Sequence, residues 1–237
     1  MIWGDAVLRL ENLGLVYPGF RLTADWTADA AEVIAVIGPS GAGKSTLLLT
    51  IAGFLAPQAG RILWQGRDLT ALPAASRPVS MLFQDQNLFP HLTLAQNLGL
   101  ALSPNLRLGQ AQAAKVAAVL DRLGLAGLGG RRPADLSGGQ QGRAALGRVL
   151  LQQRPILLLD EPFAALGPAL KTDLLLLVQE LAAEANSLVL LVTHDPRDAQ
   201  RFAGRTVLVA DGVAAAPVPT SELFANPSAA LRDYLGP

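Results

Sequence analysis

A glycine-rich loop, Gly38 to Ser45, is the first of three motifs whose residue types and spacing could do chemistry. It matches the pattern G-x-x-x-x-G-K-[ST] without a mismatch. Glycines in such a loop let several backbone N–H groups converge on phosphates, and the helix expected after it adds its positive N-terminal end. Lys44 can neutralise the β- and γ-phosphates of a nucleotide, and the Ser45 hydroxyl can ligate Mg²⁺. The residues predicted to bind the nucleotide here are Gly38, Pro39, Ser40, Gly41, Ala42, Gly43, Lys44, Ser45 and Thr46.

The second motif is an apolar strand, Ile156–Leu159, that ends in the acidic pair Asp160 and Glu161. A carboxylate at the end of such a strand can reach a magnesium ion, directly or through water, so Asp160 joins Ser45 as a predicted metal ligand. By itself the pair could also be two solvated carboxylates at a strand end.

The third motif is Leu136-Ser137-Gly138-Gly139-Gln140. The residues Ser137, Gly138, Gly139 and Gln140 form a capping box of the type S/T-x-x-Q. A capped helix start directs free N–H groups and a partial positive charge outward, which makes an anion site. Thr93 to Gln96 is a second capping box, which shows that the pattern is common, but the two glycines favour a phosphate site at Ser137–Gln140.

Along the chain the glycine-rich loop comes first, then Leu136–Gln140, then the strand that ends in Asp160 and Glu161. The three motifs in that order resemble one family, the nucleotide-binding subunits of ABC transporters. The resemblance implies that Glu161 is the general base that polarises the attacking water. It implies that Gln84 is a further metal ligand, which links the metal to a helical subdomain. It also implies that His194 contacts the γ-phosphate and that Tyr17 stacks on adenine. Tyr17 could instead be a tyrosine that packs within a sheet, and His91, the only other histidine, is expected in a surface loop.

The family resemblance also implies the partners. Two copies of the chain are expected to pack head-to-tail and to sandwich two ATP molecules with Mg²⁺. In each copy the helix that starts at Ser137 would point at the γ-phosphate bound by the other copy. The dimer would work with integral membrane permease subunits and indirectly with a substrate-binding protein. Its expected location is the cytoplasmic face of the bacterial inner membrane, as a peripheral subunit.

The chain departs from the family pattern at two glycines. After Leu136–Gln140 the family usually has a Gln-Arg pair, whereas here Gly142 stands beside Arg143. In an exposed helix turn this glycine is expected to lower stability by roughly 0.5–1 kcal/mol relative to alanine. Gly167, in the segment Ala164 to Gly167, replaces an aspartate that normally helps to link the two ATP sites. As the N-cap before Pro168 it should cost only a few tenths of a kcal/mol.

A narrower resemblance concerns the transported molecule. The segments Arg77–Phe89 and Leu98–Asn105 resemble the ATPase subunits of bacterial thiamine importers. In importers a groove beside Leu88, Phe89 and Pro90 receives a helix of the membrane subunit, although these residues could also pack inside the helical subdomain. The rival hypotheses are a non-transport ABC ATPase and a nucleotide-binding regulator with little turnover.

Composition narrows these hypotheses. The 237-residue chain carries 19 basic and 19 acidic residues, so charge gives no argument for a nucleic-acid partner. It has no cysteine, and only three lysines, one of them in the glycine-rich loop. No apolar run approaches the roughly 18–20 residues that span a bilayer, and the N-terminus shows no signal-type segment.

The patterning predicts an α/β fold: a parallel P-loop NTPase core with an N-terminal antiparallel β-subdomain and an inserted α-helical subdomain. Residues 6–10 and 16–26 carry an aromatic-rich, turn-punctuated pattern that is typical of an antiparallel sheet. A strand covered on both faces is expected at 33–37. Further strands are expected at 61–64, 79–83, 156–159, 188–193 and 207–210, with helices at 44–52 and 168–185. The helical subdomain should cover about 93–152, within a single domain of residues 1–237, and the tail should hold one short helix.

Overall fold

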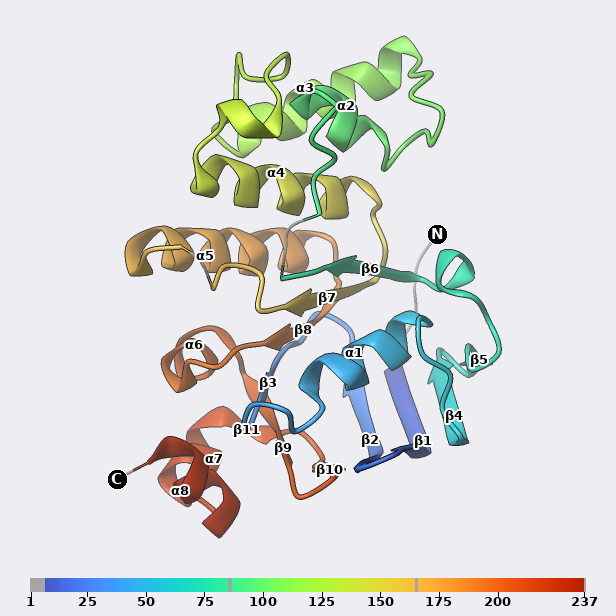
Figure 1. The fold of residues 1–237 in the computed structure, drawn as a ribbon, viewed down its shortest axis with the longest axis vertical. Coiled ribbons are helices and arrows are strands. Elements are labelled where there is room, and N and C mark those ends of the chain that lie inside the picture. Colours follow the sequence, from blue (N-terminus) through green and yellow to red (C-terminus); the bar gives the residue numbers. More distant parts are fainter. Residues whose placement is uncertain (1–6, 85–86, 165, 237) are drawn as a thin grey trace.

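A computed structural model describes residues 7–84, 87–164 and 166–236 (Figure 1). Asp85, Gln86 and Ala165, from segments singled out above, lie outside the described residues. The strands are β1 Val7–Tyr17, β2 Phe20–Asp29, β3 Val33–Ile37, β4 Ala59–Trp64, β5 Arg67–Asp68, β6 Val79–Leu82, β7 Ile156–Asp160, β8 Leu188–Val192, β9 Arg205–Ala210, β10 Val213–Ala214 and β11 Val218–Pro219. The α-helices are α1 Lys44–Ala52, α2 Leu94–Gly99, α3 Gln110–Arg122, α4 Gly138–Leu151, α5 Pro168–Glu184, α6 Pro196–Phe202, α7 Thr220–Ala225 and α8 Ala229–Leu235.

The centre of the molecule is a parallel sheet in the order β9-β3-β8-β7-β6. Strands β7 and β8 are buried at every position, which explains their uninterrupted runs of Leu, Ile and Val. Helices α5 and α6 lie on one side of this sheet and α1 lies on the other (Figure 1). All strands predicted from residue 33 onward and the helices α1 and α5 are present, with bounds within two residues of the expected ones. The strand at 61–64 is β4, which lies outside this parallel sheet.

An antiparallel sheet of β5, β4, β1 and β2 continues from the parallel one through β10. The antiparallel sheet predicted from the turn-punctuated pattern of residues 16–26 is present, and the hairpin turn lies inside that stretch, at residues 18 and 19. Gly19 has a φ of 76°, a backbone conformation that glycine adopts without strain. Tyr17 and Phe20 pair across the end of this hairpin.

Helices α2, α3 and α4 form a helical block between β6 and β7 (Figure 1). Both predicted capping boxes are present: Thr93 caps α2 and Ser137 caps α4, each through the backbone N–H of the third helical residue. One expectation about α4 was wrong, since Gly142 is buried and does not lie in an exposed turn.

Two large apolar cores hold the layers together, and a third, smaller one lies between α6, α8 and β3. One of the large cores lies between α1 and the strands of both sheets, and the other joins the helical block and α5 to the opposite face of the parallel sheet. Arg77 is a buried cation in this arrangement, with 2% of its surface exposed. Its guanidinium donates to the carbonyls of Thr50 and Ile51, at the end of α1, and to those of Thr70 and Leu72. These bonds satisfy carbonyls that a helix end leaves without partners.

The tail differs from the prediction of one short helix, because it contains two, α7 and α8. They contain only six and seven residues, so their periodicity is hard to recognise, but Leu231 of α8 is fully buried against α6 and β3. Tertiary packing thus decides what the local sequence leaves ambiguous. Within the described residues, no helix combines the length and the apolar character that crossing a membrane requires.

Candidate nucleotide-binding site

The predicted site residues follow the carboxyl ends of neighbouring parallel strands. Val36 of β3 and Asp160 of β7 both pair with Val192, the last residue of β8, and Leu82 of β6 pairs with Leu159. The glycine-rich loop, Asp160, Glu161 and His194 therefore leave the sheet at one edge, with Gln84 on the next strand. Ligands of open parallel sheets bind at this edge.

The loop between β3 and α1 takes a shape that requires glycine. Gly38, Gly41 and Gly43 have φ values of 146°, 78° and 106°. A Cβ atom on Gly38 would lie 2.0 Å from the carbonyl oxygen of Val209, so only glycine lets the loop pass β9 so closely. This conformation places the loop over the start of α1, where the free N–H groups of the first helical turn can bind an anion.

Lys44 is the buried cation of this loop. Its Nζ donates to the carbonyl oxygens of Gly38 and Pro39, at 2.8 and 2.9 Å, and 7% of the residue is exposed. Burial lowers the pKa of the Lys44 ammonium, and the nearby carboxylates of Glu161 and Asp160 act in the opposite direction. An anion bound by the loop would favour the charged lysine in the same way as these carboxylates.

Ser45 and Asp160 form a pair of oxygen ligands. The Ser45 hydroxyl donates to Oδ1 of Asp160 over 2.9 Å. In the part of the chain that the structure describes, no three His, Cys, Asp or Glu residues gather into a metal cage. Mg²⁺ commonly takes one or two protein oxygens and fills its other positions with phosphate and water. One hydroxyl and one carboxylate beside a phosphate-binding loop fit that ion.

The charge on Asp160 destabilises the folded protein in the absence of a cation. Burial raises the pKa of its carboxyl, with the hydrogen bond from Ser45 opposing the shift. Asp160→Asn is therefore expected to raise the free energy of unfolding of the nucleotide-free and metal-free protein at pH 7. Because the folded-state pKa lies above the unfolded one, the gain should shrink as the pH falls through the folded-state pKa.

Chemical denaturation of Asp160→Asn and wild type between pH 4 and pH 8, in EDTA, measures this effect. In a thermal melt of a chain of this size, each kcal/mol gained in the free energy of unfolding would raise Tm by roughly 2–4 °C. Asp121→Asn, an exposed position on α3, is the matched control and should show no such gain. A less stable Asp160→Asn protein at neutral pH would contradict the expectation.

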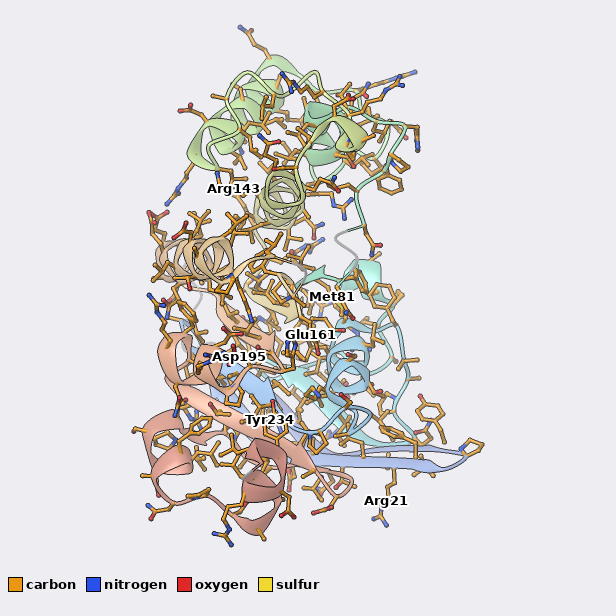
Figure 2. All side chains as sticks on the ribbon, turned by 60° about the vertical axis from the view of Figure 1, so that its left-hand side comes forward. Arg21, Met81, Arg143, Glu161, Asp195 and Tyr234 are labelled. Carbon is orange, nitrogen blue, oxygen red and sulfur yellow. The ribbon has the colours of Figure 1, made fainter. Side chains whose placement is uncertain are left out.

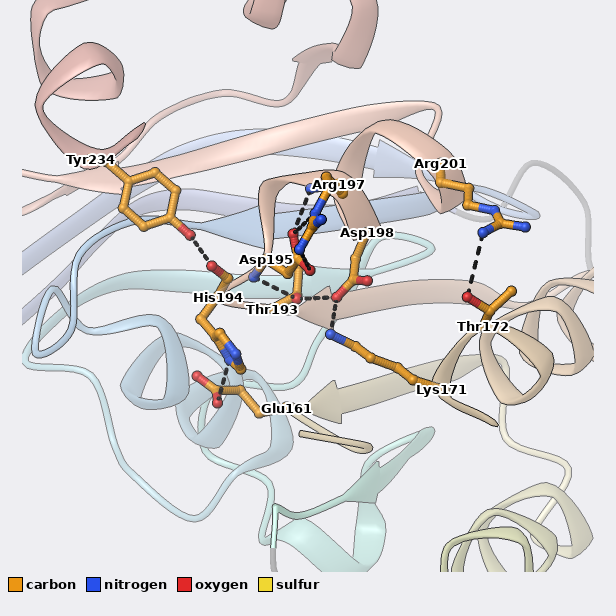
Figure 3. A network of polar contacts seen from close by, with 10 residues as sticks. All are labelled: Glu161, Lys171, Thr172, Thr193, His194, Asp195, Arg197, Asp198, Arg201 and Tyr234. Carbon is orange, nitrogen blue, oxygen red and sulfur yellow. Dashed lines mark hydrogen bonds and ion pairs between the residues drawn. The ribbon is translucent and has the colours of Figure 1, made fainter. Parts of the chain in front are cut away.

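Glu161 and His194 are in contact. His194 Nδ1 lies 3.1 Å from Oε2 of Glu161, as Figure 3 shows. Glu161 has a φ of 45°, a strained value for a residue with a side chain, and its backbone N–H bonds to the carbonyl of Val192. Strain of this kind concentrates at functional sites. A carboxylate that contacts an imidazole at a phosphate site can accept a proton from water and keep a fixed orientation.

Gln84 and Tyr17 lie at the margins of this edge. Gln84 is exposed and lies two residues beyond Leu82, the last residue of β6. Leu82 pairs with Leu159 of β7, and Glu161 lies two residues beyond Leu159, so Gln84 and Glu161 occupy matching positions on neighbouring strands. Tyr17 is half-buried, and its ring centroid is 6.2 Å from that of Phe20. The Phe20 ring contacts Gly43, so the hairpin end that carries Tyr17 lies beside the loop. Tyr17 also packs against the core, so both of its predicted roles remain open.

The signature residues Ser137–Gln140 are not brought to the glycine-rich loop within one chain. They begin α4, which lies on the far side of α5 from α1 in Figure 1. Figure 2 shows Arg143 of α4 in the upper part of the molecule, well above Glu161, with Met81 of β6 between them in that view. Gly139 fits closely against α5, since a Cβ atom there would lie 2.2 Å from a methyl carbon of Leu170. A side chain at residue 139 would therefore displace this Leu170 methyl group.

Several residues around His194 were not predicted from the sequence. Lys171 of α5 pairs with Asp198 of α6, Asp198 accepts from Thr193, and Tyr234 of α8 donates to the His194 carbonyl (Figure 3). One signal was available: Lys171 is one of only three lysines, and another of them lies in the glycine-rich loop. The partners, however, come from helices far apart in the chain.

Comparison with known proteins agrees with this geometry. Residues 23–164 match the ABC transporter family. The thiamine import ATP-binding protein ThiQ of Cereibacter sphaeroides is 66% identical over 98% of this chain and 100% of the relative. The protein of the same name from Ruegeria sp. is 55% identical over 97% of this chain and 100% of the relative. A crystal structure of a nucleotide-free ATP-binding cassette from an ABC transporter superposes with a TM-score of 0.84 at 25% identity, covering 98% of this chain and 100% of that one.

Proposed function

This chain belongs to the ABC transporter family as an ATP-binding subunit, and we propose that it hydrolyses ATP to drive the import of thiamine. The observation that carries the proposal is the meeting of Lys44, the Ser45–Asp160 pair and the Glu161–His194 pair at one edge of the parallel sheet. The cargo comes from the relatives, which are named for thiamine import. A nucleotide-binding subunit does not touch the cargo, so its own residues do not encode thiamine.

In the proposed reaction the glycine-rich loop and Lys44 hold the phosphates of ATP through backbone N–H groups and one buried ammonium. Ser45 and Asp160 would hold Mg²⁺. The ion, when bound, supplies positive charge to the phosphate oxygens. Glu161 accepts a proton from the water that attacks the γ-phosphorus, and ADP leaves.

His194 orients Glu161 and contacts the γ-phosphate. Gln84 links the metal site to the helical block, and Tyr17 stacks on adenine.

The proposed assembly is a head-to-tail homodimer. Within one chain α4 lies on the far side of α5 from the loop. Of the residues Ser137, Gly138, Gly139 and Gln140 that begin it, Ser137 and Gly138 are exposed and could face a second copy. The capped start of α4 would then place its N–H groups against the γ-phosphate held by the partner's loop. We also propose one ABC ATPase domain over residues 1–237, with a helical subdomain at about 93–152.

The proposed membrane contact is a groove of about 910 Å³ between the sheet and the helical block. Phe54 and Phe89 line it and are 56% and 45% exposed. Arg148 lies over the Phe89 ring, 5.7 Å from its centroid, and donates to the carbonyl of Asn87. The groove would receive a helix of a permease subunit, and the permease would bring the chain to the cytoplasmic face of the bacterial inner membrane. A substrate-binding protein would act on the other side.

Phe89→Asp is expected to prevent assembly with the permease subunits and to leave ATP binding within about twofold of wild type. A buried aromatic side chain is worth up to about 2–4 kcal/mol at an interface, or roughly 30- to 900-fold in affinity. Co-purification with the permease measures assembly, and Leu176→Asp, at an exposed leucine of α5, is the control. Normal assembly of Phe89→Asp would rule out this groove as the contact.

Reconstitution tests the function as a whole. In liposomes that contain the permease, the chain should hydrolyse ATP faster when thiamine and its binding protein are supplied, and thiamine should accumulate inside. Hydrolysis that neither the permease nor thiamine alters would favour a non-transport ABC ATPase. Tight ATP binding with no turnover under either condition would favour a nucleotide-binding regulator.

Gly167→Asp is expected to raise hydrolysis, or its cooperativity in ATP, about twofold or more in the assembled transporter. Gly167 is the N-cap of α5 with φ −62° and ψ 154°, and a Cβ atom there would meet open space. Aspartate fits this position and can cap the helix, which typically gains a few tenths of a kcal/mol over glycine. The restored carboxylate would link the two ATP sites across the dimer.

Gly130→Asp, also at a glycine with open space around it, is the matched control. Rates and Hill coefficients are compared for wild type and both variants. If Gly167→Asp gives wild-type values for both, Gly167 is a harmless loop variant and neighbouring groups already supply the contact.

A further inference from the structure

The ring of His194 depends on its own backbone for its position. The side chain is 58% exposed, and its hydrogen-bond contact is with Glu161. An exposed ring with one partner can turn away from it at little cost. What keeps the ring beside Glu161 must therefore be the placement of residues 193–195, which follow β8.

The hydroxyl of Thr193 fixes the residues on both sides of His194. It donates to Oδ2 of Asp198 over 2.5 Å and accepts the backbone N–H of Asp195 over 3.1 Å. Only 3% of Thr193 is exposed. One buried hydroxyl thus closes a turn around His194, and Asp198 holds that hydroxyl from the first turns of α6 (Figure 3).

Asp198 is held in turn by Lys171 of α5. Lys171 Nζ lies 2.5 Å from the same Oδ2 that accepts the Thr193 hydroxyl. The two charged side chains are 17% and 10% exposed, whereas those of the Arg122–Glu184 pair are 40% and 52% exposed. Charged hydrogen bonds away from water are stronger and less mobile than exposed ones. Lys171 also lies one turn after Gly167, whose carbonyl accepts its backbone N–H.

A third anchor comes from the tail of the chain. The Tyr234 hydroxyl donates to the backbone carbonyl of His194 over 2.9 Å. Burial raises the pKa of Tyr234, and the carboxylates of Asp195, Glu161 and Asp198 add to the shift. The phenol therefore remains a hydrogen-bond donor throughout the neutral pH range. In Figure 3 Tyr234 reaches His194 from the side opposite Lys171.

We propose that Lys171, Asp198 and Tyr234 are positioning residues that hold His194 against Glu161. This inference rests on the proposed function, in which that pair acts on the γ-phosphate and its attacking water. The Lys171–Asp198 pair fixes the turn through Thr193, and Tyr234 fixes the carbonyl in the middle of it. None of the three touches the nucleotide, so they act on turnover through His194 and not on ATP binding.

The test is a double-mutant cycle on ATP hydrolysis. Lys171→Met should lower kcat about tenfold and leave KM for ATP within about twofold, because misplacing a catalytic group by about 1 Å can cost on the order of 10²-fold. In a His194→Ala background the same change should lower the residual single-turnover rate by less than about twofold, since residues that act as a unit are not additive. Lys171→Arg, which keeps the charge, should restore most of the rate.

Three further variants distinguish a loss of His194 positioning from a defect in folding. Lys115→Met, at an exposed lysine of α3, is the matched control and should hydrolyse ATP at the wild-type rate. Lys171→Met/Asp198→Asn removes both charges, so no unpaired carboxylate remains, and it should show the same loss of kcat with a near-native melting temperature. Tyr234→Phe removes one hydroxyl only and should lower kcat about threefold, as expected for one modest hydrogen bond.

The inference is overturned if Lys171→Met hydrolyses ATP at the wild-type rate while His194→Ala is slow. It is also overturned if the Lys171→Met loss is as large in the His194→Ala background as in wild type, because the pair would then act independently of His194. A His194→Ala variant with the wild-type rate is a different result. It removes His194 from the proposed function, and the inference fails with it.

Discussion

Glu161→Gln is expected to bind ATP with wild-type affinity and to hydrolyse it at least about 10²-fold more slowly, since general-base catalysis contributes on the order of 10²–10⁴-fold. An amide has the size of the carboxylate but cannot accept the proton of the attacking water at neutral pH. Glu161 follows the Asp160 metal ligand and contacts His194 at 3.1 Å, so the substitution removes the base and leaves the rest of the site in place.

Slow hydrolysis has a second consequence. If two copies sandwich ATP, a chain that cannot complete the reaction should accumulate as an ATP-bound dimer, visible as a larger species in gel filtration with ATP and Mg²⁺. Glu222→Gln, at an exposed glutamate of α7, is the matched control and should stay like wild type in both measurements. Turnover of Glu161→Gln at the wild-type rate would leave Glu161 without a catalytic role.

The part of the fold that could be predicted from sequence is the part that local signals specify. Strands β7 and β8 are runs of apolar residues buried on both faces, and α1 begins at Lys44 and stops at Gly53, which has a φ of 89°. The turn-punctuated pattern of residues 16–26 indicated the antiparallel sheet but not the position of the turn at residues 18 and 19, because Tyr17 and Phe20 continue the strand-like aromatic pattern across it. The two tail helices were undercounted, because burial of Leu231 stabilises α8 more than its own periodicity does.

The residues of the candidate site also fall into two groups, those that a local motif predicts and those that only the folded structure brings together. Ser45 and Asp160 lie 115 positions apart, yet both could be named, because each ends or follows a buried parallel strand within a recognisable motif. Lys171, Asp198 and Tyr234 belong to no such motif, and their partners become visible only when α5, α6 and α8 pack around the turn after β8. The signature residues Ser137–Gln140 differ from these, because their motif is easily recognised in the sequence. Within a single chain, however, they lie away from the glycine-rich loop, and they are proposed to bind the nucleotide held by the loop of a second copy.

Lys44→Ala is expected to weaken ATP binding by about 10²-fold or more, because each charge-assisted hydrogen bond lost costs about 1.5–3 kcal/mol and Lys44 is proposed to serve two phosphates. Its ammonium is already buried in the loop and held by the carbonyls of Gly38 and Pro39, so it need not be drawn from water when the phosphates bind. Isothermal titration with ATP and Mg²⁺ measures the loss, and Lys115→Ala on the exposed face of α3 supplies the comparison. The loop itself should survive, since its shape depends on Gly38, Gly41 and Gly43 and removing a buried charge relieves a desolvation cost. A stable Lys44→Ala protein with unchanged ATP affinity would therefore disprove the assignment of this loop as the phosphate site, because it could not be attributed to misfolding.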